Sequence, residues 1–328
     1  MNVLVLQLKR IGDLILTTPV LAALKRSGAH VTLVVDGPCS SLLPAIPGVN
    51  EALAYRRKGD NKALWQRIRQ RGWDVCLDFT GSDRSAFMGW LSRTPRRITF
   101  QWVCKRMLRR LAYHEFVDSP VRLAHTCDHY FDLLRPLGIT PAGNDTAPSL
   151  ALPLSAREAA RDVLVGAGVQ SSYVLLHPGT ARPEKYWLPE RWTAVVAGLK
   201  SLGFSVIITS GPDAYELNHA SQIQGAPVIR PPDLLTLAAL VERARMVISC
   251  DTAVVHLAAA FRQPQIALFG PTNPFHWRPR HERAIVLSAA QPAGPMTRFL
   301  PKMTGAPTER IPSATVLLAV EQLLALPR

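Results

Sequence analysis

The stretch of sequence that decides the fold is residues 2–35, which read NVLVLQLKRIGDLILTTPVLAALKRSGAHVTLVV. Two apolar runs, Val3–Leu8 and Val31–Val35, flank a segment from Leu14 to Lys25 whose apolar residues recur at helical spacing. A strand, a helix and a second strand at this rhythm predict a parallel sheet with crossover helices. The stretch therefore predicts an α/β fold that begins with a buried strand.

The same rhythm continues through both halves of the chain. Residues 136–154 interrupt it with turn and linker chemistry, rich in proline and glycine. A chain of 328 residues also exceeds one comfortable hydrophobic core. We therefore expect two doubly wound domains, residues 1–150 and residues 151–328. Such sheets bind ligands at the carboxyl ends of their strands, so we expect the functional residues in the loops that follow the strands.

Composition narrows the class of protein. Hydrophobic residues make up 48% of the chain and charged residues 19%, as in a globular protein with ample core material. No run of about 18 apolar residues is present, so we expect no membrane-spanning helix. The five cysteines are scattered without a CxxC pair, which argues against a disulfide framework or a zinc site and favours a reducing cytoplasm.

The net charge of +14 predicts an anionic partner, such as nucleic acid, an anionic membrane or a phosphorylated substrate. A general preference of the source organism for arginine is the alternative. The charge concentrates in residues 84–110, which hold eight Lys or Arg residues, no acid, and four interleaved aromatics, Phe87, Trp90, Phe100 and Trp102. Basic and aromatic residues together suggest a membrane surface or a phosphorylated lipid head group. A solvated helical face over core aromatics would have the same composition.

The first candidate site is Lys9-Arg10-Ile11-Gly12-Asp13, directly after the first strand. Gly12 allows a close backbone approach or a positive φ. Asp13 could act as a general base toward an acceptor hydroxyl, or could simply cap the following helix. No GxGxxG is present to indicate a dinucleotide site.

Three further candidates follow strands of the second half. His177 to Trp187 offers the Thr180 hydroxyl and the cations of Arg182 and Lys185, which could clamp a diphosphate; the alternative is a solvated loop anchored by Trp187. In Ser210 to Glu216, either Asp213 or Glu216 could bind ribose hydroxyls, or both could belong to an ordinary charged first turn.

The third of these is Ser249 to Ala260, a strand, a tight turn and a helix of small residues. Free N–H groups at such a helix start make an anion site. His256 lies one turn into the helix, where a buried core histidine is the alternative to a ligand contact. Asp251 could also serve only as a helix cap.

These motifs resemble those of the ADP-heptose:lipopolysaccharide heptosyltransferases, glycosyltransferase family 9, a GT-B family of inverting enzymes. The resemblance covers nearly the whole chain, and Gly270 to Asn273 with Trp277 to Pro279 looks closest to the heptosyltransferase III branch. It implies two Rossmann-like domains facing across a cleft: an N-terminal acceptor domain, residues 1–150, and a C-terminal donor domain, residues 151–328. Residues 290–312 match no family pattern, and we interpret them as a long loop.

The resemblance also implies roles for individual residues. Asp13 would be the catalytic base that, after domain closure, takes the proton from an acceptor hydroxyl as that hydroxyl attacks the donor sugar. Lys9, Arg10, Gly12 and Arg84 would bind the acceptor. The donor would be held by the residues of the second half: Thr180, Lys185, Glu216, Asp251, Thr252, Ala253 and His256.

As implied by the same family, the donor is ADP-heptose and the acceptor is the acidic lipopolysaccharide core. No cofactor or metal ion is expected, and no nucleic acid partner. The protein would be cytoplasmic and peripherally associated with the inner membrane. Two alternatives remain: a transferase of the same fold that uses another nucleotide sugar, such as a UDP-hexose, and a non-catalytic protein that binds anionic polymers or lipids.

Overall fold

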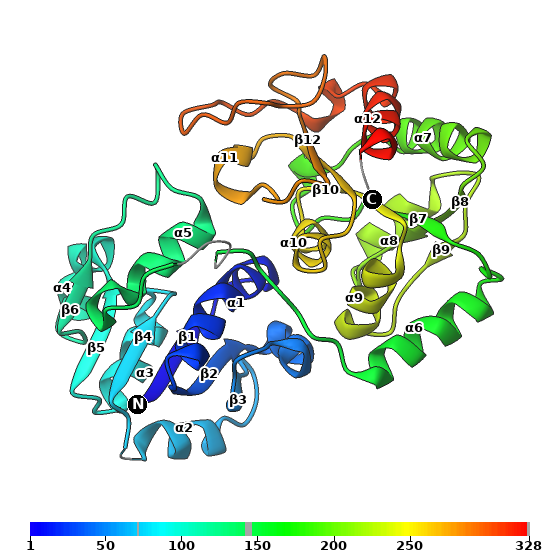
Figure 1. The fold of residues 1–328 in the computed structure, drawn as a ribbon. Coiled ribbons are helices and arrows are strands. Elements are labelled where there is room, and N and C mark those ends of the chain that lie inside the picture. Colours follow the sequence, from blue (N-terminus) through cyan, green and yellow to red (C-terminus); the bar gives the residue numbers. More distant parts are fainter. Residues whose placement is uncertain (71, 142–145, 327–328) are drawn as a thin grey trace. The chain divides into compact units, whose positions relative to one another are not determined.

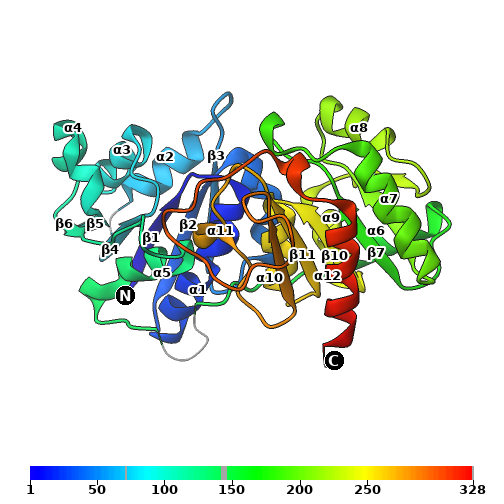
Figure 2. The ribbon, with the colours of Figure 1, turned by 90° about the horizontal axis from the view of Figure 1, so that it is seen from above.

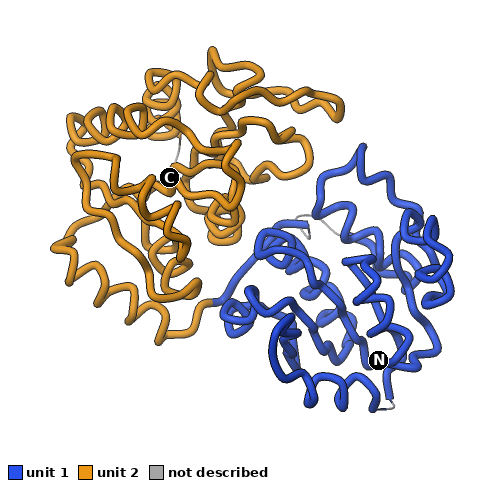
Figure 3. Tube along the Cα trace, turned by 180° about the vertical axis from the view of Figure 1, so that it is seen from behind, with its two compact units in different colours: residues 1–151 blue, residues 152–328 orange. Residues whose placement is uncertain are grey.

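The computed structural model describes residues 1–70, 72–141 and 146–326. The chain divides into two compact units, Met1–Ala151 and Leu152–Arg328, coloured separately in Figure 3. The boundary expected from the sequence lies one residue earlier, and part of the proposed linker, residues 142–145, lies outside the described residues.

Unit 1 (residues 1–151) is built on a six-stranded parallel sheet with the order β3-β2-β1-β4-β5-β6. Its central strand β1 is buried from Val3 to Gln7, as expected of a parallel strand covered on both faces. The register pairs Leu4 with Thr32 on one side and with Cys76 on the other. The strands are β1 (Asn2–Gln7), β2 (His30–Asp36), β3 (Glu51–Tyr55), β4 (Val75–Asp78), β5 (Arg96–Phe100) and β6 (Glu115–Val117).

Helices pack on both faces of this sheet, as Figures 1 and 2 show. The α-helices of unit 1 are α1 (Ile11–Arg26), α2 (Lys62–Arg69), α3 (Asp83–Leu91), α4 (Met107–Arg110) and α5 (Thr126–Phe131). Three 3-10 helices join them: η1 (Gly37–Ala45), η2 (Gln101–Lys105) and η3 (Asp132–Leu137). The crossover helix expected after the first strand is thus confirmed as α1.

Unit 2 (residues 152–328) repeats this plan with the sheet order β12-β11-β10-β7-β8-β9. Numbered within the unit and read from its other edge, the order is 3-2-1-4-5-6, the same as in unit 1 and typical of a Rossmann sheet. The strands are β7 (Tyr173–His177), β8 (Ser205–Thr209), β9 (Val228–Ile229), β10 (Met246–Cys250), β11 (Gln265–Phe269) and β12 (Ala284–Ser288). The predicted pair of doubly wound parallel sheets is therefore confirmed.

The helices of unit 2 complete a second, separate core, in which Trp187 and Trp192 are fully buried. They are α6 (Leu154–Gly166), α7 (Pro189–Ser201), α8 (Ala214–Ser221), α9 (Leu234–Arg243), α10 (Ala253–Ala260), α11 (Pro274–Trp277) and α12 (Ser313–Ala325), with the 3-10 helices η4 (Pro183–Lys185) and η5 (Thr308–Arg310). In each unit the sheet reverses its direction of winding between its first and fourth strands, β1 and β4 or β7 and β10. Ligands of Rossmann sheets bind outside the carboxyl ends of the strands at this switch point. Across the described residues, no helix is long and apolar enough to cross a membrane.

Candidate active site

The first candidate loop lies at the switch point of unit 1, between β1 and α1. Helix α1 begins at Ile11, its N-cap is Arg10, and no side chain caps it. Asp13 is therefore already inside the first helical turn, and the interpretation of Asp13 as an N-cap is wrong. Gly12 lies in the same turn and its φ is not positive, so the prediction of a positive φ at Gly12 is wrong.

The Asp13 carboxylate is held by a tyrosine from the far end of the unit. Tyr130, on α5, is almost completely buried, and its hydroxyl donates a short hydrogen bond to Asp13 Oδ1. Lys9 Nζ donates to the same hydroxyl at 3.2 Å and lies 5.0 Å from the centre of the tyrosine ring. Lys9, Tyr130 and Asp13 thus form one network in which a single phenol links the ammonium to the carboxylate.

Burial shifts the pKa values of Lys9 and Tyr130. Desolvation lowers the pKa of Lys9, while the negative charges of Asp13 and Asp78 act in the opposite direction. Burial raises the pKa of Tyr130 well above its usual value, and the adjacent Asp13 carboxylate adds to that effect. The tyrosine therefore stays protonated and acts as a hydrogen-bond donor to Asp13. Asp13 itself is only half-buried, so a solute can approach the carboxylate.

The loop after β4, on the other side of the switch point, is organised by a buried acid that sequence inspection missed. Asp78 is fully buried; it accepts hydrogen bonds from the Tyr113 hydroxyl and from the backbone N–H groups of Thr80 at 2.7 Å and Gly81 at 3.2 Å. Burial raises the pKa of Asp78, and these donors offset the rise. Thr80 Oγ1 in turn accepts from Leu8 N at 2.7 Å, which ties this loop to the loop that carries Lys9.

The remaining acceptor candidates lie apart from this network. Arg10 is exposed. Arg84 lies on α3, where its guanidinium sits 4.7 Å above the ring of Tyr55. The structure therefore brings Lys9 and Asp13 together and places Arg84 in a cation–π contact on a neighbouring helix.

The central feature of unit 2 is a buried ion pair at its own switch point. Lys185, in η4 after β7, places Nζ 2.5 Å from Asp251 Oδ2, and their side chains are only 12% and 8% exposed. Asp251 directly follows β10, and the N-cap of α10 is Thr252, so the interpretation of Asp251 as a helix cap is wrong. Arg182, expected to share the clamp, instead pairs with Glu184 at 2.6 Å on the surface.

Helix α10 begins at Ala253, two residues after Asp251 of the ion pair. Thr252 is in the extended conformation and makes no side-chain cap hydrogen bond. The N–H groups of Ala253 and Val254, at the start of the helix, lack intrahelical acceptors and can receive an anion, whereas Val255 N donates to the Thr252 carbonyl at 3.2 Å. His256 lies one turn further in and is buried.

Glu216 sits against two strand-end loops. Asp213 accepts from Tyr215 N at 2.8 Å and caps α8, so the ordinary helix-start interpretation is right for Asp213. Glu216, in the same turn, reaches past it: a Cβ added to Gly211 would lie 2.0 Å from Glu216 Oε2, and one added to Gly179 would lie 2.8 Å away. Two glycines thus make the space for this carboxylate, whose pKa is raised by burial.

The long loop of residues 290–312 closes over the Lys185 segment. Thr308 Oγ1 donates to the Lys185 carbonyl at 3.2 Å, and Trp187 Nε1 donates to the Ile311 carbonyl at 3.0 Å. Trp187 is fully buried, which confirms it as a packing anchor. Thr180 is buried in the same segment, where its hydroxyl accepts from Arg182 N at 3.4 Å. The interpretation of residues 290–312 as a loop holds apart from η5 and one bridge between Ser288 and Gln291.

The basic and aromatic segment of unit 1 divides between core and surface. Phe100 is buried, as the core alternative expects, but Phe87 and Trp90 are 51% and 59% exposed. These two rings stack at 6.0 Å, and Phe87 also meets Trp65 of α2 edge-on at 5.8 Å. An aromatic row therefore faces solvent.

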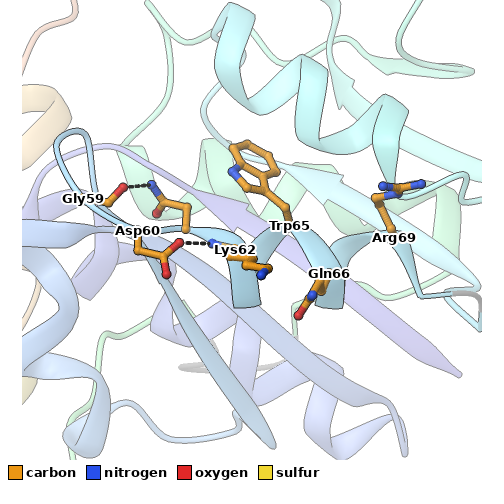
Figure 4. Close-up of a pocket in the computed structure, with 7 residues that line it drawn as sticks. Gly59, Asp60, Lys62, Trp65, Gln66 and Arg69 are labelled. Atoms are coloured by element: carbon orange, nitrogen blue, oxygen red, sulfur yellow. Dashed lines mark hydrogen bonds between the residues drawn. The ribbon is translucent and has the colours of Figure 1, made fainter.

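Each unit has a surface hollow. One of ≈ 500 Å³ surrounds the start of α2; Figure 4 shows Trp65 and Arg69 along its wall and Asp60 Oδ1 accepting from Lys62 N. The other, of ≈ 260 Å³, lies in unit 2 beside Tyr186 and Tyr215. Neither of these hollows is lined by a residue predicted for the site. Among the described residues, no group of three or more His, Cys, Asp or Glu side chains is arranged to hold a metal ion.

Comparison with known proteins yields a consistent picture. The model of glycosyltransferase family 9 (heptosyltransferase) matches residues 61–303. Lipopolysaccharide heptosyltransferase 3 of Escherichia coli K12 is 27% identical over 331 aligned residues, covering 95% of each chain. Lipopolysaccharide heptosyltransferase 1 of Pseudomonas aeruginosa is 25% identical and covers 84% of this chain and 80% of its own length.

Solved structures agree in fold. A family 9 glycosyl transferase from Veillonella parvula superposes with a TM-score of 0.84 at 24% identity, covering 98% of this chain and 97% of its own. The E. coli heptosyltransferase WaaC with ADP-2-deoxy-2-fluoro heptose superposes with a TM-score of 0.73 at 19% identity, covering 98% and 99%. These likenesses show the GT-B fold.

Proposed function

This chain belongs to glycosyltransferase family 9, the heptosyltransferases, and from that premise we propose that it transfers heptose from ADP-heptose to the lipopolysaccharide inner core. Its relatives named above are lipopolysaccharide heptosyltransferases, and one similar structure holds an ADP-heptose analogue. The observation that carries the proposal in this chain is the pair of switch points: one presents an accessible carboxylate, and the other a cation beside a helix N-terminus.

In the proposed reaction, Asp13 takes the proton from an acceptor hydroxyl, whose oxygen attacks the anomeric carbon on the face opposite the diphosphate. The bond from that carbon to the diphosphate oxygen breaks, ADP leaves, and the configuration inverts. Support comes from the position of Asp13 in the helix: it makes no capping bond, it is half-exposed, and Tyr130 fixes one of its oxygens.

The proposed donor site is in unit 2. The start of α10, at Thr252 and Ala253, would receive the diphosphate on its N–H groups, and Lys185 would stabilise the departing charge. Asp251 already pairs with Lys185 through its carboxylate at 2.5 Å and its carbonyl at 3.4 Å, so it would orient the ammonium while the third N–H donor stays available for the phosphates. Thr180 and His256 would line the same end of the sheet.

Glu216 would bind the ribose. A carboxylate near the strand ends of a Rossmann sheet suits this role, because it accepts hydrogen bonds from two neighbouring hydroxyls. Its support here is contact with the glycine backbone of both the β7 and the β8 loops.

We further propose that Lys9, Arg10, Gly12 and Arg84 face the acidic acceptor, and that the protein acts at the cytoplasmic face of the inner membrane as a peripheral protein. The net charge of +14 supports both ideas, because the acceptor and the leaflet are anionic. No metal ion enters the proposed chemistry, so transfer should survive treatment with EDTA.

The decisive experiment is product analysis by mass spectrometry, with ADP-heptose and a truncated lipopolysaccharide core as substrates. The expected product is the core plus one heptose. Calorimetry with ADP-, UDP- and GDP-sugars tests the donor separately: binding of a UDP-hexose in preference to ADP-heptose would replace the proposal with a same-fold transferase of another sugar. Salt-dependent binding of nucleic acid or lipid, with no affinity for any nucleotide, would indicate a non-catalytic binding protein instead.

A further inference from the structure

The surface of unit 1 carries an apolar tip that its own fold leaves uncovered. Helix α4 and the residue after it expose Met107, Leu108 and Leu111 by 74%, 79% and 72%. Monomeric proteins rarely leave so many neighbouring large apolar side chains in water without a function. We name these three residues, with the exposed cations Lys105, Arg106 and Arg110 around them, the apolar tip.

The tip is held rigidly on both sides. Before it, Phe100 and Val103 are buried; after it, Ala112 and Tyr113 are buried, and the Tyr113 hydroxyl is bonded to Asp78. The exposed side chains therefore belong to a tightly anchored segment and do not result from a frayed end.

The one arginine of α4 that turns inward anchors the helix. Arg109 is only 16% exposed; its Nε lies 2.5 Å from Asp83 Oδ1 at the start of α3, and its Nη1 donates to the Gly81 carbonyl at 2.6 Å. Gly81 has a φ of +64°, and a Cβ there would meet Trp102 at 2.7 Å, so the loop after β4 and η2 pack closely. Figure 2 shows α3 and α4 next to each other on the side of unit 1 where the sheet ends in β6.

This anchoring places the tip at the same edge of the sheet as Asp13. Helix α4 follows the carboxyl end of β5 through η2. Arg109 binds the loop after β4, and Thr80 of that loop binds Leu8, beside Lys9. The loop after β4 thus links the tip to the loop that leads into α1, the helix that carries the proposed base.

Charge decides which partner fits. The exposed cations Lys105, Arg106 and Arg110 surround the tip, and residues 84–114 contain no acid, so two copies of the tip would repel each other. A bilayer with anionic head groups satisfies both features at once: its interior takes the apolar side chains, and its phosphates take the surrounding cations.

We infer that the apolar tip inserts into an anionic lipid surface and holds the active edge of unit 1 against the membrane that carries the acceptor. Lipid binding itself needs only the tip, whereas its purpose rests on the proposed function. Phe87 and Trp90, two further exposed aromatics, lie on α3, the helix whose first residue pairs with Arg109.

The test is flotation of the full chain with vesicles of phosphatidylcholine alone or mixed with phosphatidylglycerol. The variant Met107→Ser/Leu108→Ser/Leu111→Ser should lower the partition coefficient at least about tenfold on the mixed vesicles. Lys105→Gln/Arg106→Gln/Arg110→Gln should remove the preference for phosphatidylglycerol. The matched control, Leu154→Ser/Val165→Ser/Leu202→Ser, changes three exposed apolar residues of unit 2 and should bind like the unmodified protein.

Transfer to a soluble truncated acceptor is measured in parallel and should be unchanged in all three variants, which separates this inference from the proposed function. The inference is overturned if the unmodified protein fails to bind the mixed vesicles, or if the serine variant binds as well as the control. A dimer that dissociates only in the serine variant would overturn it in favour of self-association, and an acidic protein captured in place of lipid would do so in favour of a protein partner.

Discussion

Each unit places a lysine and an aspartate at its switch point, but the two pairs interact in different ways. In unit 2 Lys185 and Asp251 meet directly and are buried together. In unit 1 Lys9 and Asp13 are joined through the hydroxyl of Tyr130, and the aspartate remains half-exposed. The Asp251 carboxylate is thus occupied by a buried cation, whereas Asp13 accepts from a neutral phenol and remains within reach of solvent, as a general base must.

The acids at the carboxyl ends of β4 and β10 also have different roles in the two units. In unit 1 the acid at the end of β4, Asp78, is buried and serves to organise its loop through Tyr113 and two backbone N–H groups. In unit 2 the acid after β10, Asp251, reaches across to the first loop and holds its cation. The same fold position is thus structural in one unit and part of the proposed donor site in the other.

The largest expected effect comes from replacing Asp13, whose side chain is only half-buried. Asp13→Asn should lower turnover by about 10²–10⁴-fold, because the amide cannot accept the proton, and should leave ADP affinity within about twofold. Turnover is measured with ADP-heptose and a truncated core, and affinity by calorimetry. Asp74→Asn, at an exposed aspartate of the same unit, serves as the control. Near-normal turnover in Asp13→Asn would remove Asp13 from the mechanism.

The second prediction concerns the buried ion pair of Lys185 and Asp251. Asp251→Ala leaves the Lys185 ammonium buried without its counter-ion and should cost about 3–5 kcal/mol of unfolding free energy. Lys185→Met/Asp251→Ala should regain most of that loss but bind ADP at least about tenfold more weakly than the unmodified protein. Denaturant unfolding and calorimetry measure the two quantities.

The control for this pair is on the surface. Arg182 and Glu184 form an ion pair in the same loop with both side chains about half exposed, so Arg182→Gln should change stability by less than about 1 kcal/mol. Full ADP affinity in the double variant would show that Lys185 takes no part in donor binding.

The smallest effect concerns the phenol that distinguishes the two switch points. Tyr130→Phe removes the hydrogen bond to Asp13 and should lower kcat by about tenfold with KM nearly unchanged, since a bond to a charged group is worth about 1.5–3 kcal/mol. Tyr113→Phe is a matched control, because this buried tyrosine bonds Asp78 in the same unit. Both variants should lose stability, but only Tyr130→Phe should lose kcat. Equal kcat values in the two variants would reduce Tyr130 to a structural role.

The sequence predicted the fold well because the strands of a parallel sheet are continuous apolar runs. Val3–Leu8 and Tyr173–Leu176 stand out against their surroundings, and the helices between them follow at a regular spacing. The candidate loops were located for the same reason: each directly follows a buried strand.

The partners within the site escaped prediction because they are distant in sequence. Tyr130 lies 117 residues from Asp13, and no local pattern marks such a contact. Propensity also misled: aspartate favours N-caps, but helix α1 begins two residues before Asp13. The ion pair of Arg182 with the neighbouring Glu184 was also not expected from the sequence.

The loop of residues 290–312 has a consequence for how this enzyme can diverge. Its Thr308 hydroxyl rests on the Lys185 carbonyl, and a Cβ on Gly270 would lie 2.0 Å from that same hydroxyl. We therefore expect a change of length in this loop to alter the packing against the backbone of Lys185. Selection on the proposed donor site can therefore act through this loop as well as through the residues proposed to bind the donor.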